Sequence, residues 1–348
     1  MQYEKWIDVN YKKLESFYAE EDYGLTAKEW IAEDIKELRE GELTVASISD
    51  VFKDLSRWGL HDTLFYLLHK KEEKEALKEF QKSSAYGYLC VTAIDQTWGC
   101  TAFHGSKKQF ELMDKVNRMM AQCLIAGWDK EANTLADIMI ESIRYGDTEE
   151  GNKIISTGFF ATPAAWFMLE LYSLVEEKPF AKENADYPES MAPYDAVLNQ
   201  WKSKDKTLLD DLVSQLCEKH LEQSQEQKTD QDYFEFGDTY AKLFPYEILA
   251  WFIYRERAGL KNPTTFTHPL MNTPIAQFFL ALQKPLPYPT ELPYGKEFMQ
   301  MLKESCPNVE IPQWLLTINN EESPSKDTTF TSPIKGDNNI PDDFFKDE

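Results

Sequence analysis

Apolar residues recur at intervals of three and four along most of this 348-residue chain. That spacing places them on one face of a helix, and no stretch shows the sustained apolar–polar alternation of a half-buried strand. We therefore expect an all-α protein, built as an irregular multi-helix array of antiparallel helix hairpins. Helices are predicted over about 3–20, 27–40, 47–69 and 73–97, and again across most of 106–146, 163–176, 194–223, 240–258 and 274–305.

The segment 106–146 predicts one helix hairpin. Ser106 and Gln109 have the spacing of a capping box at a helix start. Gly127 interrupts the helical pattern, and Asp129 suits the cap of a second helix. The first helix carries one apolar stripe, and the second has its own buried face, made of Ala132, Leu135, Ala136, Met139 and Ile143. The hairpin resembles a single tetratricopeptide unit, but no second copy follows at a fixed period, and a solenoid needs about three.

The stretch "YAKLFPYEILAWFIYRERAGLKNPTTFTHPLMNTP", residues 240–274, predicts a buried helix and its exit. Pro245 suits the first helical position, and Gly259 lies just past the end. Because "ILAWFIY" is apolar on every face, we expect other helices to surround it. Glu247 falls in the first turn, where a carboxylate is favoured, and we interpret both it and His268 as structural residues.

Composition along the chain predicts four parts. An N-terminal helical lobe covers residues 1–178, and a stretch rich in charge and proline over 179–193 reads as a linker or long loop. A C-terminal helical lobe covers 194–318. Residues 319–348 lack periodicity and carry eight acids against three lysines, so we expect a disordered acidic tail.

The formal net charge is −23, from 60 acidic against 37 basic residues. Such a surface repels nucleic acid and anionic membranes and attracts basic partners at high association rates. The five cysteines are an odd number with irregular spacing, which fits a reducing cytoplasm better than a disulfide framework. No apolar run approaches 18 residues, and the charged N-terminus does not read as a secretory signal, so we expect a cytoplasmic protein.

The familiar motifs of enzymes are missing from this sequence. No glycine-rich phosphate loop, hydrolase elbow, zinc pattern or paired metal-binding histidines occur, so we predict no catalytic residue, metal or cofactor. Asp137 and Glu141 stand one helical turn apart, which is typical of a solvated helix face. An enzyme whose site is assembled from scattered residues stays open as an alternative.

Acids and aromatic residues come together in "DQDYFEFGD". A surface loop of this kind places rings in a partner's pocket and surrounds them with charge. We therefore name a candidate partner-binding set here, with the alternative that its aromatic rings turn inward onto the core: Asp230, Asp232, Tyr233, Glu235 and Asp238. A second candidate surface is the first helical pair, which has twelve acids against six bases through Glu42.

The helix "FPYEILAWFIYRERAGL" followed by "FTHPLMNTP", after an acidic helical first half, resembles the large helical immunity proteins of bacterial polymorphic-toxin and type VI secretion systems. The likeness lies in a late aromatic helix with an embedded glutamate, here Tyr246, Glu247 and Trp251, leading into a proline-containing segment. The aromatic-Gly-Tyr-Trp opening of one such family is absent. The resemblance implies a cognate toxin, a basic nuclease or other enzyme domain, inhibited by stoichiometric binding. A helical adaptor that binds peptides, similar to tetratricopeptide proteins, is the alternative.

Overall fold

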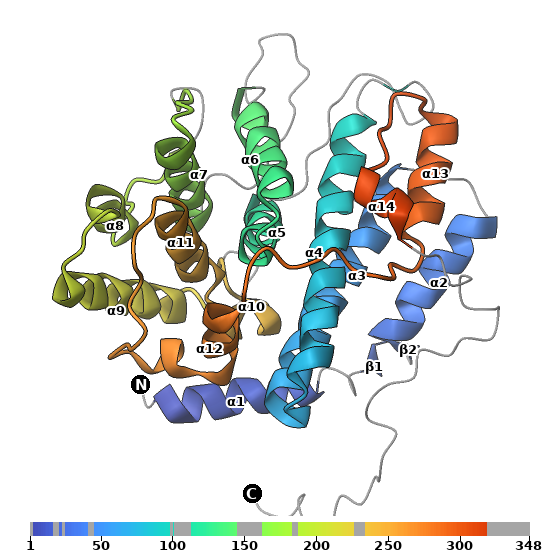
Figure 1. Ribbon diagram of the computed structural model, residues 1–348. Coiled ribbons are helices and arrows are strands. Elements are labelled where there is room, and N and C mark those ends of the chain that lie inside the picture. The colour runs from blue at the N-terminus through green and yellow to red at the C-terminus, as the bar shows by residue number, and fades with distance from the viewer. Residues whose placement is uncertain are drawn as a thin grey trace, which may run out of the picture.

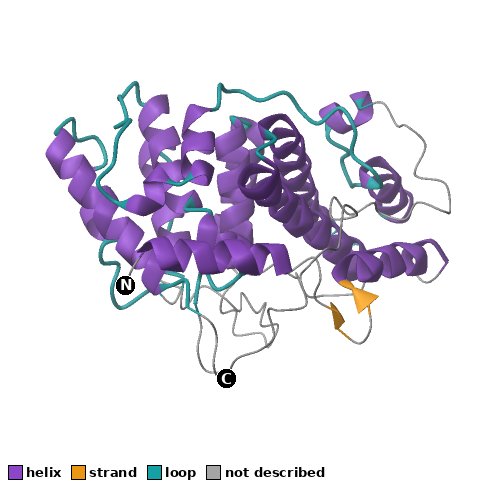
Figure 2. Ribbon diagram, turned by 90° about the horizontal axis from the view of Figure 1, so that it is seen from below, coloured by secondary structure: helices purple, strands orange, loops and turns teal. Residues whose placement is uncertain are grey.

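The computed structural model describes residues 3–16, 21–22, 25–40, 45–97, 100, 113–144, 162–182, 187–225 and 234–318. Within these ranges the chain is all-α, as the apolar periodicity predicted. The extended pairing found there is one antiparallel contact between two-residue strands, β1 (Glu21–Asp22) and β2 (Leu25–Thr26). These strands lie at one edge of the helical array (Figure 2). The predicted tail, 319–348, lies outside the described residues.

The first part of the array is built on two long helices that pack along their length, α3 and α4 (Figure 1). Gly59 of α3 allows this close approach, since a Cβ there would stand 2.9 Å from the Cβ of Ser83 in α4. The helices of this part, together with the π-helical turn η1, are α1 (Tyr3–Ser16), α2 (Ala27–Glu40), α3 (Val45–Phe65), η1 (Tyr66–Lys70) and α4 (Glu73–Gln96).

Helix α5 (Met113–Ala126) lies at the centre of the array and is buried on all sides from Val116 onward. The sequence predicted one apolar stripe, but α5 packs against α4, α6, α7 and α11 at once, so its polar residues are buried as well. Gly127 ends it with a φ of +74°, a conformation that favours glycine. Helices α6 (Asp129–Arg144) and α7 (Pro163–Glu176) follow. The predicted antiparallel arrangement of the 106–146 hairpin stays a prediction.

The next group of helices surrounds α11 (Tyr246–Arg257). Ten of its residues are buried, Pro245 stands at its N-cap, and Gly259 follows its end with a φ of +72°, so the predicted core helix is confirmed. The other helices of this group are α8 (Tyr194–Gln200), α9 (Lys206–Glu222), α10 (Thr239–Leu243), the 3-10 helix η3 (Pro269–Asn272) and α12 (Pro274–Ala281).

After α12 the chain runs back across the array to α3 and α4, where α13 (Gly295–Ser305) and α14 (Gln313–Thr317) pack (Figure 1). On the way, Leu286 donates its N–H to the Ala126 carbonyl at 2.8 Å, and the Trp128 indole donates to the Leu286 carbonyl at 2.9 Å. One hydrophobic core therefore includes residues from both predicted lobes. The division into 1–178, 179–193 and 194–318 stays a prediction, and the packing crosses it.

Candidate functional site

Of the five predicted partner-binding residues, two are described, and Asp230, Asp232 and Tyr233 lie outside the described residues. Glu235 is buried, with 7% of its surface exposed, and its carboxylate accepts the backbone N–H of Ala164 at 2.9 Å. That N–H belongs to the first turn of α7, where a carboxylate satisfies an otherwise unpaired donor and complements the helix dipole. Glu235 thus has an internal role in this structure.

Asp238 is exposed and stands at the N-cap of α10. Its carboxylate accepts the hydroxyl of Tyr240, and the guanidinium of Arg118 donates to that same hydroxyl oxygen at 2.6 Å. The guanidinium also lies over the Tyr240 ring, 4.6 Å from its centroid. The Asp238 carboxylate is therefore the outer end of a polar chain that ties α10 to the buried α5.

His61 of α3 packs edge-on to the Tyr240 ring, with centroids 4.9 Å apart. Burial holds the pKa of His61 well below its usual value, and the nearby Arg57 and Arg118 guanidinium groups lower it further. An imidazole in this position stays neutral, because desolvation and positive neighbours both disfavour its charged form.

Five carboxylates gather between α2 and α3. Glu33, Asp34 and Glu37 are exposed on α2, whose apolar residues Ile31, Ile35 and Leu38 face the core. Asp50 and Asp54 stand one turn apart on the neighbouring α3. We call the five carboxylates the acidic face: Glu33, Asp34, Glu37, Asp50 and Asp54.

The carboxylates around Asp34 disfavour its ionisation. The pKa of Asp34 is raised by partial burial first, and then by the negative charges of the other four members. Burial also raises the pKa of Asp54, against the opposing effect of the Arg57 and Lys53 cations. A cation that approaches Asp34 relieves the repulsion from its neighbours.

The acidic face is fixed in place by an ion pair at the end of α2. Arg39 donates from Nε and Nη2 to the two carboxylate oxygens of Glu297 on α13, at 2.8 Å each. Its guanidinium also lies over the Tyr294 ring, 5.3 Å from the centroid. This two-point contact orients α2 relative to α13 and so orients the carboxylates that α2 carries.

A fully buried polar pair joins His220 of α9 to Glu247 of α11, both 0% exposed. His220 Nδ1 lies 2.9 Å from Glu247 Oε1, and Nε2 lies 2.9 Å from the Lys242 carbonyl oxygen. Since a carbonyl only accepts, Nε2 carries a hydrogen. The contact between Nδ1 and Oε1 is then a hydrogen bond through one proton, which is carried either by the imidazole or by the Glu247 carboxyl group. The Phe236 ring stacks on the imidazole at 4.1 Å, so this member of the 230–238 segment does turn inward.

This pair joins α9 to α11 through the core, and the structural interpretation of Glu247 agrees with it. His268 is also structural, since its ring accepts the Leu270 N–H at 3.2 Å and so begins η3. Burial lowers the pKa of His268, partly offset by Glu218. The sequence did not indicate His220 as the partner of Glu247, because the two residues are 27 positions apart. The available signal was a glutamate directly before the run "ILAWFIY", which is apolar on every face of the helix.

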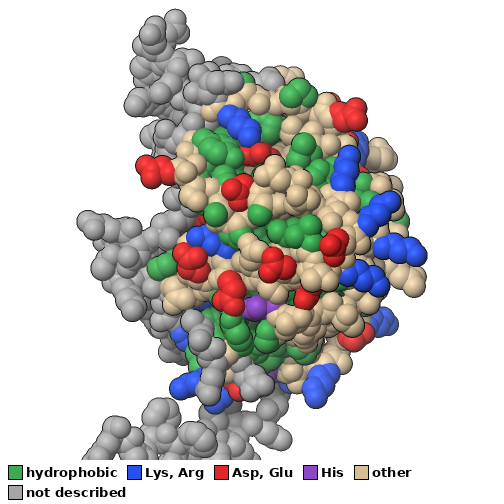
Figure 3. Space-filling model, turned by 90° about the vertical axis from the view of Figure 1, so that its left-hand side faces the viewer, with side chains coloured by type: hydrophobic (Ala, Val, Ile, Leu, Met, Phe, Trp, Pro, Cys, Tyr) green, Lys and Arg blue, Asp and Glu red, His purple; other side chains and the backbone are tan. Residues whose placement is uncertain are grey.

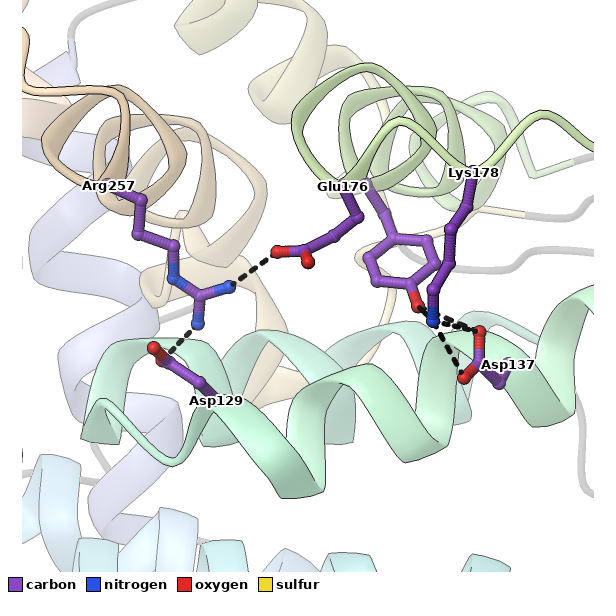
Figure 4. A network of polar contacts seen from close by, with 6 residues as sticks. Asp129, Asp137, Glu176, Lys178 and Arg257 are labelled. Atoms are coloured by element: carbon purple, nitrogen blue, oxygen red, sulfur yellow. Dashed lines mark hydrogen bonds and ion pairs between the residues drawn. The ribbon is translucent and has the colours of Figure 1, made fainter.

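Ionic contacts join α6 to the ends of α7 and α11 (Figure 4). Arg257 bridges Asp129 and Glu176, the latter at 3.7 Å. Lys178 lies 3.2 Å from Asp137, which also accepts the Tyr172 hydroxyl at 2.7 Å. Asp137 is exposed, as predicted for a solvated helix face, and it serves to fasten α7 to α6.

The side of the array that carries α8 and α9 has a mixed surface (Figure 3), where acidic side chains are interspersed with Lys and Arg. A polar groove of about 530 Å³ opens near the start of α9, lined by Lys206, Thr207, Asp210 and residues 262–267. Asp210 accepts both the N–H and the hydroxyl of Thr267, at 2.9 and 2.5 Å. Its carboxylate therefore holds the groove wall together.

Within the described ranges, His, Cys, Asp and Glu side chains form no group of three or more that could hold a metal ion. Over the same residues, every helix is too short or too polar to cross a membrane. Comparison of the chain with models of known families, with curated proteins and with solved structures finds no match in any of the three.

Proposed function

We propose that this protein is an immunity protein that binds a basic antibacterial toxin and neutralises it by covering the toxin's active site. The observation that carries the proposal is the acidic face on α2 and α3, in a chain of net charge −23. The resemblance of residues 244–274 to helical immunity proteins of polymorphic-toxin and type VI secretion systems supports the same class. No catalytic role is proposed for the protein itself.

The physical argument is electrostatic. A nuclease or similar enzyme must attract phosphates, so its cleft is positive. An acidic inhibitor is drawn to that cleft, and such steering raises association rates by about 10- to 1,000-fold. The carboxylates of the acidic face occupy folded helices, and Arg39–Glu297 orients α2, so little conformational entropy is lost when they meet the partner.

The acids of the two candidate surfaces differ in their internal contacts. Glu235 is committed to the start of α7, and Asp238 to the Tyr240 hydroxyl. The acidic face, which belongs to the first helical pair and its neighbour α3, has four exposed carboxylates and the half-buried Asp54, and the other four members raise the pKa of Asp34. We therefore propose the acidic face as the principal contact, with the 230–238 segment as a secondary one.

The first experiment is capture of the tagged full-length protein from its native cells, with a series of salt washes and mass spectrometry of the proteins retained. We expect one stoichiometric partner of basic charge, released as the salt concentration rises. Several unrelated partners would instead favour the adaptor alternative. A bound small molecule with no protein partner would favour the enzyme alternative.

Once the partner is identified, association kinetics of variants test whether it binds the acidic face. The triple variant Glu33→Lys, Asp34→Lys, Glu37→Lys should slow association at low salt by about tenfold or more. The matched control reverses three exposed acids elsewhere: Asp211→Lys, Glu222→Lys and Glu304→Lys. Both variants change the net charge equally. If they slow association equally, overall charge and not the acidic face governs binding.

A further inference from the structure

Two of the five cysteines meet at the junction between the end of α4 and the end of α13. All five cysteines are free thiols in this structure. Cys100 follows α4 and is partly exposed, whereas Cys306 caps the end of α13 and is 3% exposed. The neighbouring Cys100 thiol also contributes to the raised pKa of Cys306. The Cys100 Sγ also lies 3.6 Å from the carbonyl oxygen of Ser305, the residue next to Cys306.

The backbone on both sides holds the thiols together. Cys100 N–H donates to the Thr97 carbonyl at 3.0 Å, and Cys306 N–H donates to the Leu302 carbonyl at 2.7 Å. Farther along, the Gln96 side chain accepts the Glu310 N–H at 2.7 Å, so Gln96 and Cys100 each contact the segment 305–310. Because the Cys100 sulfur lies against the carbonyl group next to Cys306, side-chain rotation can bring the two sulfurs together.

We propose that Cys100 and Cys306 are a redox-active pair that forms a reversible disulfide when the protein meets a peroxide. The cross-link fastens the C-terminal segment from Cys306 to Ile318 to the end of α4. It goes beyond the proposed function, because it needs no toxin and does not involve the acidic face.

The chemistry begins at the exposed thiol. The Cys100 sulfur, as thiolate, attacks one peroxide oxygen, the O–O bond breaks, and Cys100 becomes a sulfenic acid as a water molecule is released. The Cys306 sulfur then attacks the Cys100 sulfur, the S–O bond breaks, and a second water leaves as the disulfide forms. Two thiols are oxidised and one peroxide is reduced.

The environments of the cysteines explain this order. Burial raises the pKa of Cys306 to about 11, with the neighbouring Cys100 adding to the shift, so Cys306 reacts poorly with an external oxidant. Burial also raises the pKa of Cys123 and Cys217 well above the usual value, and these thiols are 0% exposed. Those two thiols serve as internal controls.

The test treats the reduced full-length protein with hydrogen peroxide, then unfolds and alkylates it, and maps its peptides by mass spectrometry. We expect two of the five thiols to escape alkylation, one peptide pair to contain Cys100 joined to Cys306, and dithiothreitol to reverse the change. The oxidised protein should also melt at a higher temperature than the reduced protein, because the cross-link restricts the unfolded chain.

Two variants keep the test decisive. Cys100→Ala should retain all four remaining thiols through the same treatment, and Cys306→Ala should accumulate a sulfenic acid at Cys100 that dimedone captures. The matched control, Cys90→Ala in the buried part of α4, should form the cross-link as the native protein does. Five alkylatable thiols after treatment, a different pairing, or a cross-link between two chains would overturn the proposal.

Discussion

Replacing Glu247 by alanine tests how much the buried pair with His220 contributes to the fold. The substitution removes the partner of His220 Nδ1, which is 0% exposed and has no access to water. It also leaves a cavity between α9 and α11. Removing one member of a buried charged or hydrogen-bonded pair costs about 3–5 kcal/mol. For a chain of this size, about 2 °C of melting temperature accompanies each kcal/mol, so we expect a decrease of about 6–10 °C.

Glu247→Gln should be much less harmful. Its amide can donate to Nδ1 of a neutral His220 while Nε2–H still donates to the Lys242 carbonyl, so both hydrogen bonds survive. We expect a loss of about 1 kcal/mol, the usual value of one altered hydrogen bond. Both Glu247→Ala and Glu247→Gln remove the carboxylate charge, but only the alanine variant also removes the hydrogen bond and the side-chain volume. The difference in stability between the two variants therefore measures hydrogen bonding and packing without the effect of net charge.

The measurement is urea and thermal unfolding of the native protein and both variants, followed by circular dichroism at neutral pH. Glu256→Ala is the matched control, since this exposed glutamate lies on the same helix and contacts Lys284 at 3.5 Å. An exposed pair of that kind contributes about 1 kcal/mol or less. If Glu247→Ala melts within about 2 °C of the native protein, the reasoning about the buried pair is refuted.

Three further predictions rest on other contacts. Gly127→Ala should lower the free energy of unfolding, measured with urea, by about 2 kcal/mol. Alanine is strained at this positive φ, and its Cβ would stand 2.9 Å from Pro285 Cα. A decrease of less than about 0.5 kcal/mol would contradict this reasoning. Arg255→Lys should cost about 3 kcal/mol by the same assay, since one ammonium cannot replace a guanidinium that donates to three carbonyl oxygens and one side-chain amide. The free energy of unfolding should decrease as the pH falls from 7.5 to 5.5, because the unfolded chain protonates His61 near its usual pKa of 6.5 while the folded protein, with a lowered pKa, does not. The His61→Gln variant should show a weaker decrease over this interval, and an equal one would assign it to other groups.

Much of the secondary structure could be predicted from local pattern. The helix expected at 27–40 is observed as Ala27–Glu40, and the one expected at about 73–97 as Glu73–Gln96. Gly127 and Gly259 end helices where their positions indicated. These features depend on residues a few positions apart, so they can be predicted from short stretches of the sequence.

The candidate site was less predictable. The acidic face combines α2 with α3, and only packing brings the two rows of carboxylates together. The 230–238 segment carries the same residue types, yet Glu235 turns toward α7 and Phe236 toward His220. Composition shows how many acids a segment has, but the direction each one faces depends on neighbours far along the chain.

The sequence by itself determined the helical class, the strong negative charge, and the buried character of the 246–257 helix. Only the tertiary structure decided which polar residues meet. His220 and Glu247 are 27 residues apart, Cys100 and Cys306 are 206 apart, and Arg118 and Tyr240 are 122 apart. Helical periodicity repeats every 3.6 residues and records which face of each helix is apolar. It carries no information on which other helix covers that face, and the pairing of distant groups follows from that choice.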